Sequence, residues 1–146
     1  MFMDALLLVS DAQAFTAAAV STNSIDLGLY TPKRDISVGE PMGFAFQVDV
    51  AASSTTVKIE IITATDAALT AGIIVLAERT LLAADLPLGR LWFLSLPPGP
   101  VAGYLRYIGI RVTPAGGAAT VTLTSWLTAR DLFSVAGINY AKGYSL

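Results

Sequence analysis

The chain has 146 residues with a formal net charge of −2, and it contains no histidine and no cysteine. These absences exclude an imidazole base, a thiolate nucleophile and a zinc site built from those side chains. Hydrophobic residues make up 54% of the chain and charged residues 14%, whereas soluble domains have roughly 45–50% and about 25%. The length fits one domain, residues 1–146, too short to bury all of this apolar surface in its own core. We therefore expect an assembly component that buries the remainder against a partner. Without a basic excess, we expect no direct binding to nucleic acid.

The apolar start of the chain lacks the features of a signal peptide, because Asp4 stands where basic residues would be expected. The longest apolar run elsewhere covers only residues 71–77, whereas a membrane helix needs about 20 residues. We expect a soluble protein that is made inside the cell and has no membrane partner.

Alternation of apolar and polar residues dominates the middle of the chain, as half-buried strands require. Clear strands are predicted at residues 44–50, 56–61, 104–112 and 121–128. Weaker strand candidates are residues 17–20, 25–27, 73–77 and 91–96, and residues 66–69 are a candidate for one helical turn.

Turn-forming residues separate these strands. Pro114-Ala115-Gly116-Gly117 predicts a hairpin that joins the strand at 104–112 to the strand at 121–128. Seven or eight successive strands with little helix favour an all-β fold, an antiparallel β-sandwich or barrel, with a jelly roll as the natural candidate.

The two ends of the chain differ from its middle. Residues 1–15 are apolar without clean alternation, and residues 131–146 have no period although they contain several aromatic side chains. Disordered tails are poor in aromatic residues, so both ends are predicted to be extended arms that lie on a surface. Pairing of residues 1–15 into the chain's own sheet is the alternative, and the tail could dock on its own chain or on a neighbour. The predicted interface anchors are Leu6, Leu7, Leu8, Phe133, Tyr140 and Tyr144.

Carboxylates are the main candidates for chemistry that remain, because any two of the eleven could form a glycosidase pair. Asp49 and Glu60 lie on the polar faces of neighbouring predicted strands. We favour solvated strand faces, with pairing to Lys58 or Arg111, over a catalytic pair. No metal-ligand cluster, phosphate-binding glycine motif or Gly-x-Ser-x-Gly nucleophile motif is present. The sequence therefore predicts no catalytic residues, no cofactor and no metal.

Trp126 is the candidate binding residue of the predicted strand at 121–128, because it falls on the face that carries threonines. Three interpretations stay open: a surface tryptophan covered by a loop, an anchor for a partner protein, or a platform for a sugar ring. Trp92, beside Phe93, is assigned to the core.

Four stretches in the first 50 residues carry a family resemblance: MDAL at 3–6, VSDAQA at 9–14, AAVSTNSIDLG at 18–28 and RDISVG at 34–39. They resemble the capsid cement (decoration) proteins of tailed phages, a family typified by a Bordetella phage protein. The similarity is strong over residues 3–50, and the tail at 131–146 is longer than the family leads us to expect.

The resemblance implies a jelly-roll β-sandwich without enzymatic activity. It also implies a homo-oligomer on the outer surface of an icosahedral head in the virion, where the protein braces several copies of the major capsid protein. Two other functions remain open. One is a receptor- or glycan-binding domain of a phage tail or cell surface that uses Trp126. The other is a small hydrolase that uses carboxylates alone.

Overall fold

The computed structural model describes residues 5–29, 41–97, 104–116 and 119–130. Within these residues the chain forms short 3₁₀ helices and a series of β-strands. The helices are η1 (Ala5–Leu7) and η2 (Ala83–Asp85). The strands are β1 (Leu8–Phe15), β2 (Ala19–Val20), β3 (Ile25–Asp26), β4 (Met42–Val50), β5 (Thr56–Ala64), β6 (Ile74–Leu82), β7 (Leu91–Ser95), β8 (Tyr107–Ala115) and β9 (Val121–Ala129).

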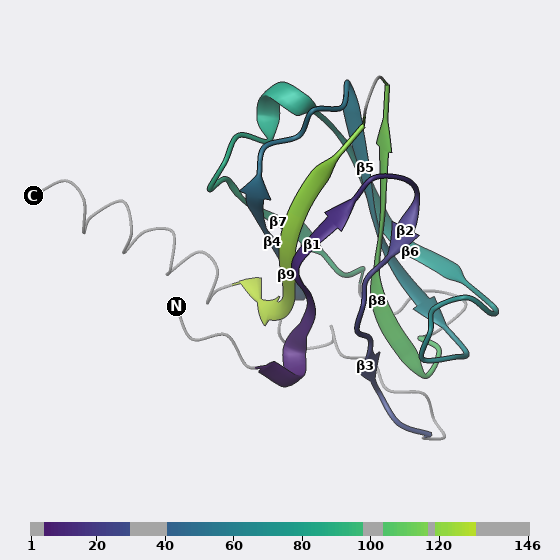
Figure 1. Cartoon of the computed structure of the whole chain (residues 1–146). Helices are drawn as coiled ribbons and strands as arrows, with labels where there is room; N and C mark the ends of the chain where they lie inside the picture. Colours follow the sequence, from purple (N-terminus) through teal and green to yellow (C-terminus); the bar gives the residue numbers. More distant parts are fainter. Residues whose placement is uncertain (1–4, 30–40, 98–103, 117–118, 131–146) are drawn as a thin grey trace, which may run out of the picture.

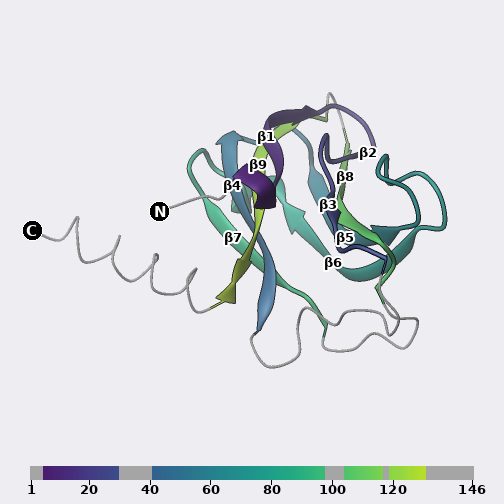
Figure 2. The same ribbon diagram turned by 90° about the horizontal axis from the view of Figure 1, so that it is seen from below.

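The strands form two antiparallel sheets that pack face to face (Figures 1 and 2). Sheet A has the strand order β1-β9-β4-β7, and sheet B has the order β2-β8-β5-β6, with β3 also paired to β8. The expected all-β sandwich is therefore confirmed.

The order of pairing identifies the sandwich as a jelly roll. The innermost pair along the chain is β5 with β6, and it lies in sheet B. The next pair outward, β4 with β7, lies in sheet A. The pair of β2 and β8 returns to sheet B, and the outermost pair, β1 with β9, lies in sheet A. Nested pairs that alternate between two sheets are what a long hairpin produces when it is rolled into a jelly roll.

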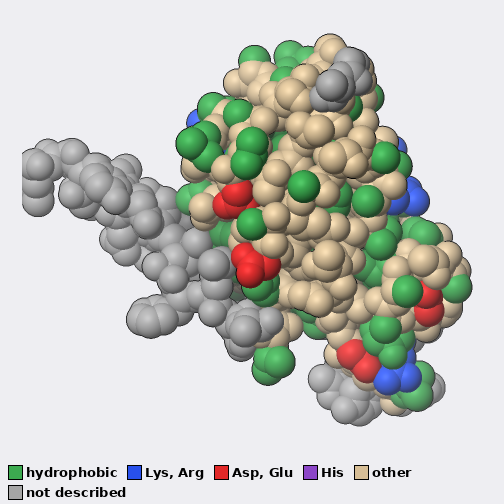
Figure 3. Space-filling model, in the orientation of Figure 1, with side chains coloured by type: hydrophobic (Ala, Val, Ile, Leu, Met, Phe, Trp, Pro, Cys, Tyr) green, Lys and Arg blue, Asp and Glu red, His purple; other side chains and the backbone are tan. Residues whose placement is uncertain are grey.

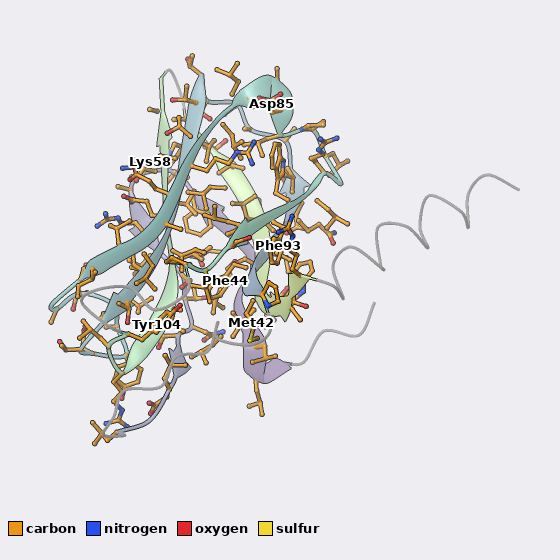
Figure 4. The ribbon with its side chains drawn as sticks, turned by 180° about the vertical axis from the view of Figure 1, so that it is seen from behind. Met42, Phe44, Lys58, Asp85, Phe93 and Tyr104 are labelled. Carbon is orange, nitrogen blue, oxygen red and sulfur yellow. The ribbon has the colours of Figure 1, made fainter. Side chains whose placement is uncertain are left out.

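The core lies between the sheets and follows the predicted alternation. Phe44, Phe46 and Val48 of β4 point inward, and Ile59 and Ile61 of β5 face them from sheet B. Figure 4 shows Phe44 between the two layers and Lys58 on the outside of the sandwich. Burial of these large apolar side chains provides the main stabilisation of the fold.

The predicted hairpin at Pro114-Ala115-Gly116-Gly117 is wrong. β8 runs to Ala115 in sheet B, and β9 belongs to sheet A, so the connection crosses from one sheet to the other. β8 has β5 on one side and β2 and β3 on the other. Because both edges of β8 are occupied, β9 cannot form a hairpin with it.

The loop between β5 and β6 also differs from the prediction. Residues 66–69 form a turn instead of a helical turn, with Leu69 at a φ of 56°. The Asp66 carboxylate accepts hydrogen bonds from the backbone N–H groups of Thr70 and Ala71, at 2.9 and 2.8 Å. Leu69 is buried on the outer face of sheet B, against Ile62 and Ala64. The side-chain cap and this apolar contact together stabilise the turn.

The N-terminal segment is part of the fold. Residues 8–15 form β1, which pairs with β9, and both Val9 and Phe15 are completely buried. The expectation of an arm on a neighbour is therefore wrong for this part of residues 1–15, and the alternative of pairing within the chain's own sheet is confirmed. A β-bulge at Ala12, with a φ of 43° and shifts in register, interrupts the alternation that identifies a strand.

Candidate interaction surface

An apolar row crosses the outer face of sheet A from strand to strand. Trp126 of β9 pairs with Leu8 of β1 on one side and with Ala45 of β4 on the other. Ala45 in turn pairs with Phe93 of β7. Leu127, the next residue of β9, faces the core and belongs to the main apolar cluster. We name these four residues, Leu8, Trp126, Ala45 and Phe93, the outer row.

The two central residues of the outer row are covered in the folded chain, whereas Leu8 and Phe93 are half-buried. Trp126 is only 3% exposed and Ala45 is completely buried. Gly43 leaves room for the Phe93 ring, because a Cβ at position 43 would lie 2.7 Å from Phe93 Cζ. Trp126 thus lies on the predicted strand face, but its ring is not open to solvent. A ring covered to this extent has no free face on which a sugar could stack, and its role as an anchor for a partner stays a prediction.

The three N-terminal leucines differ in exposure. Leu6 is 83% exposed, whereas Leu7 is half-buried and packs against the core, and Leu8 is half-buried in the outer row. Among the predicted anchors that are described, Leu6 is therefore the one that offers most of its side chain to a partner. Phe133, Tyr140 and Tyr144 lie outside the described residues.

A charged network occupies the outer face of sheet B. Arg111 Nε donates to Glu60 Oε2 at 2.6 Å, and Lys58 Nζ lies 3.0 Å from Glu60 Oε1 and 2.8 Å from Glu78 Oε2. The Glu60 side chain is only 4% exposed. The hydrogen bond from Arg111, and then the one from Lys58, hold the pKa of Glu60 below its ordinary value of 4.5 although burial opposes this. The predicted pairing of Glu60 with Lys58 and Arg111 is confirmed, but the expectation of a solvated strand face is wrong at Glu60, because its side chain is nearly buried.

Asp49 does not join Glu60 in a catalytic pair. Asp49 belongs to β4 in sheet A, and Glu60 belongs to β5 in sheet B. The Asp49 carboxylate instead accepts a hydrogen bond from Thr124 Oγ1 at 2.6 Å. The expectation that these two carboxylates are neighbours is wrong, because the chain changes sheet between β4 and β5.

Asp26 is also engaged by neighbouring groups of its own chain. Asp26 forms an ion pair with Arg106, with Oδ2 2.8 Å from Nη2, and also accepts a hydrogen bond from the Gly28 N–H. Both contacts lower the pKa of Asp26.

Within the described residues, no group of three or more acidic, histidine or cysteine side chains could hold a metal ion. No helix in the described part of the chain is long and apolar enough to cross a membrane.

The structure adds a cluster that the sequence analysis missed. Trp92, assigned to the core, is half-buried, and the guanidinium carbons of Arg79 and Arg90 lie 4.7 and 5.3 Å from its ring centroid. The spacing of Arg90 and Trp92 by two residues places both on one face of an extended segment and could have indicated this contact. Arg79 comes from β6 in the other sheet, and no local pattern predicts that approach.

The surface of the chain combines few charges with scattered apolar side chains. On the face seen in Figure 3, charged side chains are sparse among polar and hydrophobic ones. The large hydrophobic residues with the greatest exposure are Leu6, Leu29, Val50, Val75, Leu82 and Leu88. This composition is compatible with several small contacts to partners.

Comparison with known proteins gives one family. The family model described as Bbp16 matches residues 9–126, from the second residue of β1 to Trp126 in β9. No individual curated protein matches the chain. The match covers most of the chain and every strand of the jelly roll, and it agrees with the resemblance found in the first 50 residues. The chain therefore belongs to the Bbp16 family, a family of Bordetella phage proteins.

Proposed function

We propose that the chain is a cement protein that binds the outside of an icosahedral phage head and braces neighbouring major capsid protein subunits. The observation that carries this proposal is the match to a phage family along the whole jelly roll. The resemblance of residues 3–50 to capsid cement proteins supports the more specific part of the proposal, a role as a cement protein.

A structural role without catalysis is part of the proposal. Its support is the use of the polar groups: Glu60 is engaged by Arg111 and Lys58, and Asp49 is engaged by Thr124. These carboxylates stabilise the sheets, and the sequence offers no histidine or cysteine to take over chemistry.

The protein would act by multivalent binding. Exposed apolar side chains such as Leu6 and Leu88, at 83% and 71% exposure, can each make a modest contact with a capsid subunit or with a second copy of the chain. Once one contact has formed, the other binding sites of the same molecule are held at a high effective concentration near their partners. Several weak contacts therefore give high avidity. A module that spans neighbouring subunits in this way opposes the outward pressure of packaged DNA without making or breaking a bond.

The test is addition of the purified chain to phage heads that lack it. We expect the chain to co-sediment with the heads at saturating stoichiometry and to raise the temperature at which they release DNA, because binding to the intact state stabilises it. Leu6→Ser should weaken binding without lowering the melting temperature of the free chain. Heads that neither bind the chain nor gain stability would contradict the proposal.

A further inference from the structure

The cluster of Arg79, Trp92 and Arg90 closes one side of the sandwich. β6 and β7 are the terminal strands of sheets B and A and follow one another in the chain, so their free edges lie on the same side. Arg79 reaches from β6 and Arg90 from the residue before β7, and both approach the Trp92 ring. Trp92 Nε1 donates to the Asp85 carbonyl oxygen at 3.2 Å, which holds the ring in place.

Among the described cations, Arg79, Arg90 and Arg130 form no ion pair with a described residue, and Arg79 and Arg90 share one aromatic ring. Lys58, Arg106 and Arg111 each form an ion pair. Arg79 and Arg90 form none with the described residues, although both are exposed. Glu78, the neighbour of Arg79 in sequence, is held by Lys58 on the outer face of sheet B.

Within the described residues, Arg79 and Arg90 are thus two guanidinium groups without an ion pair that share one aromatic ring. Stacking on the ring orients each group and lowers the entropy lost when it binds a carboxylate. A carboxylate can accept two parallel hydrogen bonds from each planar group.

The neighbourhood suits a protein partner better than a small molecule. The cavity between Trp92, Arg79 and Ile59 has a volume of about 10 Å³, room for about one water molecule. Leu88, two residues before Arg90 in the chain, is 71% exposed. Tryptophan and arginine are two of the residue types that are enriched at protein-binding hot spots.

We propose that Arg79 and Arg90, stacked on Trp92, dock acidic side chains of the capsid subunit at the side of the sandwich where β6 and β7 end the two sheets. This inference rests on the proposed function and adds which side of the molecule meets the shell and which chemistry it recognises. The local positive charge carries it, because two guanidinium groups that share one ring and have no ion pair with a described residue favour carboxylates on a partner.

The test measures binding of full-length variants to phage heads that lack the chain, at several salt concentrations. Arg79→Gln and Arg90→Gln should each weaken binding by about tenfold and flatten its salt dependence, since each removes a charge-assisted contact. Arg79→Lys and Arg90→Lys should fall between, because lysine keeps the charge but loses the planar fork. Arg106→Gln is the matched control, because its guanidinium is already paired with Asp26, and it should change binding less than twofold.

The melting temperature of each free variant distinguishes a loss of binding from a loss of folding. Arg90 does not line the cavity, so Arg90→Gln serves alone if Arg79→Gln lowers stability. If the wild-type chain binds and both glutamine variants bind as tightly with the same salt dependence, the docking surface is wrong and the cement function stands. If the glutamine variants bind the heads normally but no longer associate with one another, the site binds a second copy of the chain, and the inference is also wrong. If the wild-type chain does not bind the heads, the cement function and this inference both fail.

Discussion

Arg111 and Glu60 face each other across the pairing of β8 and β5, with Arg111 Nε 2.6 Å from Glu60 Oε2 and Nη2 3.1 Å from Oε1. This two-pronged contact, completed by Lys58, places a nearly buried carboxylate in a central strand of sheet B. A buried charge is tolerated only when its partners replace the lost water, so the network ties β5, β6 and β8 together.

The network makes stability depend on acid. The folded chain holds the pKa of Glu60 below its ordinary value of 4.5, mainly through Arg111. The stabilisation is therefore fully present above the unfolded pKa and is lost as the pH falls through the lower folded pKa. We expect the free energy of unfolding, measured in urea from pH 7 down to about pH 3, to decrease below about pH 4.5.

Glu60→Gln isolates this contribution from other acidic groups such as Asp26, whose pKa is also lowered. The variant should lose about 1–3 kcal/mol of unfolding free energy at pH 7, because Arg111 keeps only a weaker, neutral acceptor. Its difference from the wild-type chain should shrink as the pH falls. A difference that is constant from pH 7 to pH 3 would show that the ion pair does not govern the acid response.

Gly43 is predicted to be intolerant of any side chain. A Cβ there would lie 2.3 Å from the Leu94 carbonyl oxygen and 2.7 Å from Phe93 Cζ, so the pairing of β4 with β7 would have to open. Gly43→Ala should cost about 3 kcal/mol, at the upper end of overpacking penalties. Gly89→Ala is the control, since no atom lies within 4 Å and its φ of +78° should cost only about 1 kcal/mol. Equal losses in thermal or urea unfolding would refute the steric argument.

Local pattern was sufficient for the central strands of the fold. β4, β5 and β9 have an apolar face that packs on the core, and their predicted bounds differ from the observed ones by at most a few residues. The edge strand β6 was predicted only as residues 73–77, whereas it extends to Leu82. The reason is that Arg79 stands between Ala77 and Leu81 on the core-facing side of β6, where alternation requires an apolar residue.

The remaining features depend on contacts between distant parts of the chain. The bulge at Ala12 hides the alternation of β1, and only its pairing with β9 reveals a strand. Alternation along β9 predicts on which face of sheet A the Trp126 side chain lies. Its burial depends on contacts with other parts of the chain, which alternation does not predict. The stacking of Arg79 on Trp92 joins two sheets, and neither residue has a local pattern that indicates the other.

Trp126→Ala should destabilise the fold. Because the ring is 3% exposed, its removal leaves a cavity, and truncation of a buried aromatic side chain costs roughly 3–5 kcal/mol. Leu6→Ala, at 83% exposure, should change unfolding free energy by no more than about 0.5 kcal/mol. A Trp126→Ala variant as stable as the wild-type chain would mean that the ring is not packed in solution.

The C-terminal segment 131–146 is predicted to matter more for partner binding than for folding. β9 ends at Ala129, and Arg130 donates its backbone N–H to the Pro41 carbonyl oxygen at 2.7 Å, so a chain that ends at Arg130 keeps every described strand. The family match also ends before this segment, at residue 126. We expect the truncated chain to remain β-rich by circular dichroism and to unfold cooperatively, but to bind phage heads markedly less well.

A full-length variant separates loss of anchors from loss of chain length. Phe133→Ala, Tyr140→Ala and Tyr144→Ala together should reproduce most of the binding defect, because aromatic side chains bury the largest area at an interface. The measurements are co-sedimentation with heads and the melting temperature of each free chain. If the truncated chain and the triple variant both unfold well below the full-length protein, these aromatic side chains pack on their own sandwich, and the bracing-arm prediction is wrong for this end.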